Sequence, residues 1–144
     1  AVADPGSQLV KLCHRHNIEV VPCSGPSSLM LALMGSGLNG QSFAFLGYIP
    51  AKTDERRQAL KSIEKHSASA HQTKIMIETP YRNDSLFADI LNVCQGSTEL
   101  CVAADITMPD AYIMTKTVAE WKRYVAGKES IIGKRPCVFL ILAH

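Results

Sequence analysis

Apolar residues follow two different spacings along this chain, and these spacings predict helices and strands in turn. Apolar positions at helical spacing predict helices around residues 9–13, 26–38, 53–66, 83–94 and 118–125. Short apolar or alternating runs predict strands at residues 18–21, 41–48, 74–78, 99–105, 112–117 and 137–142. Because strands alternate with helices, we expect an α/β fold whose mixed sheet lies after residue 40 and is flanked by helices.

The predicted helix over residues 53–66 is highly charged. Thr53 is placed to cap its beginning, and the only apolar contacts expected from it are Ala59, Leu60 and Ile63. The polar residues 67–72 that follow predict a loop. We therefore expect this helix to be solvated over most of its surface.

The stretch VVPCSGPSSLMLALMGSGL, residues 20–38, begins as a strand and continues through a Gly-Pro-Ser-Ser turn into a helix of small and apolar residues. Pro26 suits the first turn of that helix. Ser27 and Ser28 admit two interpretations. Their hydroxyls satisfy the end of their own helix, or, together with the free N–H groups of its first turn, they hold a polar ligand group or an anion.

Three buried strands end in small, polar or proline residues, at VVPCSGPSS, KIMIETP and CVAADIT. In layered α/β folds the carboxyl ends of strands open onto crevices where ligands bind, so three such ends predict one pocket. Glu78 either accepts hydrogen bonds from an amine or a ribose or pairs with Arg82. Asp105 presents the same alternative between a ligand acceptor and a paired structural charge.

Composition predicts a globular chain with no membrane partner: 47% of residues are hydrophobic, 19% are charged, and the longest apolar stretch, 29–34, is too short to cross a bilayer. The net charge of +2 neither requires nor excludes an anionic partner. Basic residues that form either a solvated face or a nucleic-acid footprint are Arg56, Arg57, Lys61, Lys65, Lys122, Arg123, Lys128, Lys134 and Arg135.

The cysteines and histidines argue against disulfide and metal chemistry. The five cysteines are an odd number without a C-x-x-C pair, which favours a reduced, cytoplasmic protein with buried thiols. His14 and His16 point to different faces of a helix, so we predict no metal site. The sequence also contains no Ser-His-Asp signature, P-loop or G-x-G-x-x-G motif.

Motifs from end to end of the chain resemble the tetrapyrrole methylase family of S-adenosylmethionine-dependent methyltransferases. The chain is most similar to the branch that methylates a ribose 2′-hydroxyl of small-subunit (16S) ribosomal RNA. The motifs are ADPG (3–6), VVPCSGPSS with GSGL (35–38), FAFLGYIPAK (43–52), ERR (55–57), IETPYRN (77–83), AADIT (103–107) and the closing strand. ADPG is similar to the family's S-D-P-G, and IETPYR to its Y-E-S-P-H-R.

The resemblance implies two α/β domains, the methyl donor S-adenosylmethionine in the cleft between them, and a homodimer. On this basis residues 1–24 are the end of the first domain, residues 25–38 are an interdomain junction helix, and residues 39–144 are the second domain. We expect the chain to be a fragment that begins inside the first domain, so that residues 1–24 are the last helix-strand unit of that domain.

The resemblance also implies roles for individual residues. Ser27 and Ser28 match donor contacts at the domain junction. The residues expected near the adenosine part of the donor are Glu78, Thr79, Ala104, Asp105, Ile106 and Thr107. Lys52 and Arg82 fit a substrate-facing or structural role. Two departures stand out: the branch's A-R-E-L-T-K is here Ala-Ala-Asp-Ile-Thr-Met, without its two basic residues, and Tyr81 replaces the usual His.

Three functions follow as hypotheses: a methyltransferase that acts on small-subunit ribosomal RNA, a C-methyltransferase whose substrate is a tetrapyrrole, and a non-catalytic dimerisation and half-site module. Methyl transfer from a sulfonium needs no covalent enzyme nucleophile, in agreement with the lack of a triad. A ribose hydroxyl acceptor would benefit from a general base, but the sequence identifies no residue for that role.

Overall fold

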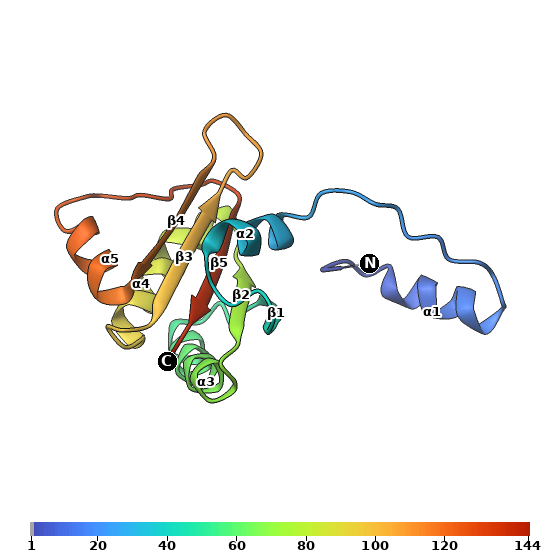
Figure 1. Cartoon of the computed structure of the whole chain (residues 1–144), viewed down its shortest axis with the longest axis horizontal. Coiled ribbons are helices and arrows are strands. Elements are labelled where there is room, and N and C mark those ends of the chain that lie inside the picture. The colour runs from blue at the N-terminus through green and yellow to red at the C-terminus, as the bar shows by residue number, and fades with distance from the viewer. Residues whose placement is uncertain (1) are drawn as a thin grey trace.

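A computed structural model describes residues 2–144, in which five strands form one mixed sheet of order β1-β2-β5-β3-β4 (Figure 1). The strands are β1 (Phe43–Tyr48), β2 (Thr73–Ile77), β3 (Glu99–Ala104), β4 (Tyr112–Thr117) and β5 (Cys137–Leu142). β1 and β2 are parallel, whereas β5 is antiparallel to both β2 and β3, and β4 is antiparallel to β3. The predicted α/β fold with a mixed sheet is confirmed.

Helices cover both faces of the sheet. On one face lies α2 (Ser28–Ser36), and the other carries α3 (Thr53–Ala70), α4 (Asn83–Val93) and α5 (Val118–Val125). A single turn of 3-10 helix, η1 (Pro80–Arg82), joins β2 to α4. The central strand β5 is buried at every position, with Phe139 and Ile141 in the core under α3–α5 and Val138, Leu140 and Leu142 in the core under α2. A strand buried on both faces reads as a continuous apolar run, as this one does.

The N-terminal segment stands apart from this body. Helix α1 (Ser7–Arg15) contains no buried residue, and an extended stretch links it to α2 (Figure 1). The predicted strand over residues 18–21 is wrong, because these residues lie within that extended stretch without strand hydrogen bonds. The β-branched Ile18, Val20 and Val21 favour extended backbone, but a strand also needs a hydrogen-bonded neighbour, and none of the five strands in residues 2–144 pairs with this stretch.

Helix α3 differs from its prediction in three ways. It continues to Ala70 rather than ending at 66, and Thr53 is its first residue, while the N-cap position is Lys52 without a side-chain cap. Its end is tied down because the hydroxyl of buried Ser67 donates to the Gln72 carbonyl at 2.8 Å and accepts from the Ala143 N–H at 3.0 Å. The third difference is a buried polar face formed by Arg56, Glu64 and Ser67, although most other positions of the helix are exposed, as expected.

That buried polar face centres on Arg56, which is 2% exposed. Its Nε donates to Oδ2 of buried Asp89 at 2.7 Å, and its Nη1 and Nη2 donate to the Ala51 carbonyl and the Ser85 hydroxyl. Arg57 donates from Nε to the other carboxylate oxygen of Asp89 at 2.8 Å. The ERR motif therefore joins α3 to α4 through Asp89, with the side chain of Arg56 buried and that of Arg57 47% exposed.

Candidate functional site

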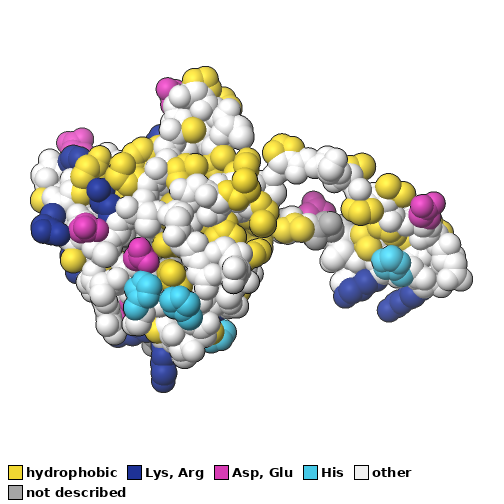
Figure 2. All heavy atoms as spheres, viewed as in Figure 1, with side chains coloured by type: hydrophobic (Ala, Val, Ile, Leu, Met, Phe, Trp, Pro, Cys, Tyr) yellow, Lys and Arg dark blue, Asp and Glu magenta, His cyan; other side chains and the backbone are white. Residues whose placement is uncertain are grey.

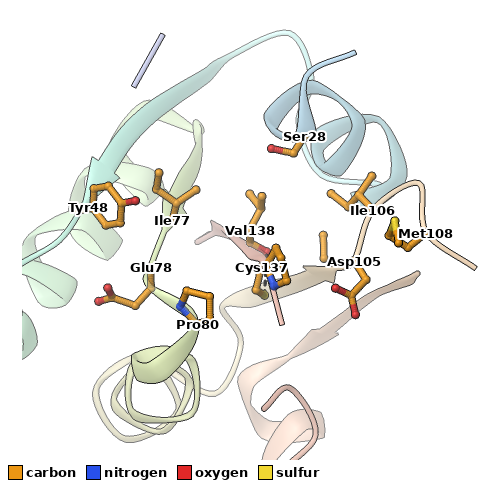
Figure 3. Close-up of a pocket in the computed structure, with 12 residues that line it drawn as sticks. Ser28, Tyr48, Ile77, Glu78, Pro80, Asp105, Ile106, Met108, Cys137 and Val138 are labelled. Carbon is orange, nitrogen blue, oxygen red and sulfur yellow. Dashed lines mark hydrogen bonds between the residues drawn. The ribbon is translucent and has the colours of Figure 1, made fainter. Parts of the chain in front are cut away.

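A cavity of about 320 Å³ lies where β1, β2 and β3 end and β5 begins, beside the first turn of α2 (Figure 3). Because β5 runs antiparallel to β2 and β3, its first residues lie beside their last ones. Ligand sites of open α/β sheets lie at such strand ends. The residues that line the cavity are Ser28, Tyr48, Ile77, Glu78, Pro80, Ala103, Asp105, Ile106, Met108, Pro136, Cys137 and Val138.

Glu78 is the buried acid of this cavity, and its side chain is 0% exposed. Its Oε1 accepts the Thr79 N–H at 2.7 Å and the Nε and Nη2 groups of Arg82 at 3.0 and 2.7 Å. Its Oε2 is also buried but has no hydrogen-bond partner among residues 2–144. The pairing with Arg82 is therefore present in the structure, and it leaves Oε2 as a buried acceptor without a partner among the described residues.

Asp105 lies in a tight turn after β3 and also lines the cavity. The φ angles of Asp105 and Thr107 are 49° and 74°, a left-handed conformation that is uncommon for residues other than glycine. The turn is held by hydrogen bonds from the Asp105 N–H to the Pro136 carbonyl at 3.0 Å and from the Met108 N–H to the Asp105 carbonyl at 2.9 Å. The carboxylate Oδ2 lies 3.5 Å from Nη1 of Arg135. Backbone held in this way is concentrated at ligand sites.

The two serines lie at the beginning of α2, where Ser28 lies across the cavity from these acids (Figure 3). Ser27 occupies the N-cap position with extended backbone, but its hydroxyl makes no capping hydrogen bond. Ser28 lines the cavity, and the first-turn N–H groups of a helix have no partner within it. Of the two interpretations, side-chain capping by Ser27 is not present in the structure.

The wall between these polar groups is apolar, formed by residues such as Ile77, Ala103 and Val138 from three strands. Cys137 is the thiol at this site, and burial raises its pKa to about 12. A thiol with that pKa stays protonated at neutral pH and does not act as a nucleophile. The cavity thus combines an apolar wall with polar groups at its edges, an arrangement suited to binding and orienting a ligand.

The structure brings four of the predicted site residues to this cavity: Ser28, Glu78, Asp105 and Ile106. Ser27 lines a neighbouring hollow that it shares with Ser28. The other predicted residues do not line the cavity: Thr79 and Arg82 hydrogen bond to Glu78, Ala104 faces the core under α3–α5, Thr107 is exposed, and Lys52 pairs with Glu55 at 3.3 Å.

Sequence reasoning named none of the other eight lining residues, of which Ile77, Pro80, Ala103 and Met108 adjoin predicted residues, while the remaining four are Tyr48, Pro136, Cys137 and Val138. Tyr48 ends β1, so the rule that strand ends line pockets would have found it. Cys137 and Val138 begin β5 and Pro136 directly precedes it, and only the strand order brings these three residues here.

The sequence has well-matched relatives. It is 35% identical over 129 residues to ribosomal RNA small subunit methyltransferase I of Vibrio cholerae, covering 90% of this chain and 43% of that protein. It is 31% identical over 140 residues to the protein of the same name from Pseudomonas aeruginosa, covering 97% of this chain and 48% of that protein. These relatives confirm the resemblance to the tetrapyrrole methylase family that the motifs indicate.

Solved structures of tetrapyrrole methylases share the fold. The methyltransferase CobJ matches with a TM-score of 0.60 at 13% identity, over 99% of this chain and 60% of that chain. Uroporphyrin-III C-methyl transferase from Thermus thermophilus, solved with S-adenyl homocysteine, matches with a TM-score of 0.53 at 15% identity, over 98% and 60% of the two chains. No family model matches the sequence.

The chain spans a little under half the length of the two curated relatives described above, 43% and 48%. Among the described residues, no helix has the length and apolar character needed to cross a membrane, and no group of three or more His, Cys, Asp or Glu side chains is arranged to hold a metal ion.

Proposed function

We propose that this chain is part of an S-adenosylmethionine-dependent methyltransferase that methylates a ribose 2′-hydroxyl of small-subunit ribosomal RNA in the cytoplasm. The observation that carries the proposal is the cavity at the strand ends, with the unpartnered carboxylate oxygen of Glu78, in a chain more than 30% identical to proteins named ribosomal RNA small subunit methyltransferase I.

The residues of the cavity fit the methyl donor. The apolar wall of Ile77, Ala103 and Val138 suits the flat adenine, and Oε2 of Glu78 is an acceptor for a ribose hydroxyl or an amine. The first turn of α2, with Ser27 and Ser28, suits the donor's carboxylate because helix N-termini favour anions. When bound, S-adenosylmethionine supplies a methyl group that the positive charge on its sulfur has already activated.

This chain's own contribution is to bind and orient the donor. Glu78 and Asp105 are each paired with an arginine, so we assign neither the role of general base. Fixed orientation of two reactants is worth up to about 7–11 kcal/mol of the barrier. We place the proton acceptor outside the residues that line the cavity and assign no catalytic residue here.

We further infer the domain division expected from the resemblance: residues 1–24 in a first domain, residue 1 lying outside the described part, 25–38 as the junction and 39–144 as the second domain. Two observations support it. Leu9, Leu12 and Ile18 expose apolar side chains that a packed domain would cover, at 64%, 48% and 58%. Figure 2 also shows apolar side chains gathered where the N-terminal segment meets the body. We infer a homodimer as well.

The tetrapyrrole C-methyltransferase is the second candidate, favoured by the names of the structural neighbours. Their identity of 13–15% supports only the fold, whereas the sequence relatives above 30% carry the ribosomal RNA name. The third candidate, a non-catalytic dimerisation and half-site module, applies to this chain in isolation.

One experiment separates the first two candidates. The complete protein is incubated with donor carrying a labelled methyl group and either small ribosomal subunits or uroporphyrinogen. Label in RNA supports the proposal, and label in the tetrapyrrole overturns it in favour of the second candidate. Calorimetric titration of S-adenosylhomocysteine into this chain addresses the third, which predicts no heat of binding.

A further inference from the structure

An exposed aromatic ring lies beside the mouth of the cavity. Tyr81 belongs to η1, the turn directly after β2, and its neighbour Pro80 lines the cavity. Tyr81 is 81% exposed, more than any other tyrosine in the described chain. Covering such a ring gains free energy, but single exposed apolar side chains are common, so the inference depends on what surrounds the ring.

The backbone beneath this ring is fixed. Arg82 anchors the turn through its hydrogen bonds to buried Glu78, and the Arg82 N–H donates to the Thr79 carbonyl at 2.9 Å. Asn83 is 0% exposed. Its Nδ2 donates to the carbonyls of Gly133 and Arg135 at 3.1 and 2.7 Å. The turn that carries Tyr81 is therefore held in place from both ends.

Asn83 also places a cation next to the ring. The two carbonyls that it binds flank Lys134, whose Nζ lies 5.3 Å from the centroid of Tyr81. A cation at this distance over an aromatic face is attracted by the ring. Lys134 and Tyr81 thus form an exposed pair on a clamped base, rather than two side chains that happen to be close.

Other exposed apolar side chains and paired arginines lie at the same end of the sheet. Tyr48 and Met108, which line the cavity, are each 60% exposed. Arg82 and Arg135 neutralise the two acids of the cavity, Glu78 and Asp105, so those carboxylates do not repel an anion there. Aromatic rings interleaved with cations are the surface that binds single-stranded nucleic acid, where bases stack and phosphates pair with cations.

We propose that Tyr81 is a platform on which an unpaired nucleobase of the RNA substrate stacks, with Lys134 contacting the adjacent phosphate. The substrate class rests on the proposed function, whereas the platform rests on the exposure of Tyr81 and its clamped pairing with Lys134. The pair lies beside the donor cavity, so a base held there keeps a neighbouring ribose near the cavity mouth.

The test uses the complete protein and four variants: Tyr81→Ala, Tyr81→Phe, Lys134→Ala and, as a matched control, Lys61→Ala. Lys61 lies beside Ala143 and His144, at the opposite end of β5 from the cavity. Binding of a fluorescently labelled single-stranded RNA oligonucleotide is followed by anisotropy over a range of salt concentrations. S-adenosylhomocysteine affinity, the KM for small ribosomal subunits, and the oligomeric state by sedimentation are measured in parallel.

Tyr81→Ala is expected to weaken oligonucleotide binding, and to raise the KM for subunits, by roughly 5- to 100-fold, with donor affinity unchanged. Tyr81→Phe keeps a ring that can stack and should bind within about twofold of the unsubstituted protein. Lys134→Ala should reduce the salt slope of binding by about 0.7, the value for one phosphate contact on a single strand. Lys61→Ala should leave binding unchanged.

The outcomes separate this inference from the proposed function. If Tyr81→Ala leaves oligonucleotide binding unchanged, the platform is overturned. The same holds if the unsubstituted protein does not bind the oligonucleotide. A change of oligomeric state in Tyr81→Ala also overturns it, since the ring would then belong to a protein interface. If the protein binds RNA in a Tyr81-dependent way but transfers no methyl group, the proposed function fails and the platform stands.

Discussion

Arg82 holds Glu78 by a single oxygen. Nε and Nη2 of Arg82 lie 3.0 and 2.7 Å from Oε1, while Oε2 is buried beside the cavity without a hydrogen-bond partner in the described residues. An unpaired buried acceptor costs about 1–3 kcal/mol relative to one that is satisfied. The arginine orients the carboxylate, so that a ligand donor which reaches Oε2 recovers that cost.

Glu78→Gln should therefore weaken donor binding. The amide retains the shape of the side chain but removes the negative charge, and a hydrogen bond to a charged group is worth about 1.5–3 kcal/mol. We expect the Kd for S-adenosylhomocysteine, measured by calorimetry in the complete protein, to rise roughly 10- to 100-fold. Thr79→Ala is the control, because Glu78 accepts only the backbone N–H of that residue. An unchanged Kd in Glu78→Gln would contradict the role of Oε2.

The double variant Ser27→Ala with Ser28→Ala should lower donor affinity with little change in thermal stability. The reason is that Ser27 makes no capping hydrogen bond that alanine would remove, whereas Ser28 lines the cavity. Loss of a capping hydroxyl costs about 0.5–2 kcal/mol, so the melting temperature tells the two roles apart. A large drop in melting temperature with the same donor affinity would return the serines to helix capping.

Arg135→Ala should loosen the turn at Asp105. Besides facing Asp105 at 3.5 Å, Arg135 donates from Nε and Nη2 to the carbonyls of Ile132 and Ile131 at 2.9 and 3.0 Å. Both the loop before β5 and the turn after β3 lose an anchor in the variant. We expect a loss of about 1–2 kcal/mol in the free energy of unfolding and a weaker affinity for S-adenosylhomocysteine. Lys122→Ala, an exposed substitution on α5, should change neither quantity.

The sequence predicted those parts of the site in which a polar side chain directly follows a predicted strand. Glu78 and Asp105 are carboxylates directly after apolar runs, and both line the cavity. Cys137 and Val138 could not be predicted in this way, because they reach the cavity only through the position of β5 between β2 and β3. The spacing of apolar residues along the chain does not reveal the order of strands in a sheet. The extended residues 18–21 show the converse limit, since local preference predicts a strand but pairing depends on a distant partner.

Arg56 illustrates the same limit for charge, and it leads to a prediction about stability. The sequence predicted either a solvated face or a nucleic-acid footprint for Arg56, whereas the structure buries it in a pair with Asp89, 33 residues along the chain. Burial alone would raise the pKa of Asp89, but hydrogen bonds from Arg57 and Arg56 outweigh it and hold that pKa below its usual value. Removal of one partner from a buried ion pair costs about 3–5 kcal/mol, because the other charge remains uncompensated.

Asp89→Asn should therefore lower the free energy of unfolding by about 3–5 kcal/mol at pH 7, measured by urea denaturation. An unfolded aspartate titrates near pH 3.9, and the folded pKa of Asp89 lies lower. The pair thus stabilises fully above about pH 5 and loses its contribution as the pH falls through the folded pKa. The variant should show a shallower decline between pH 5 and 2 than the unsubstituted protein, whereas the exposed substitution Asp110→Asn should match the latter. Equal acid dependence in Asp89→Asn and the unsubstituted protein would mean that this carboxylate does not link folding to pH.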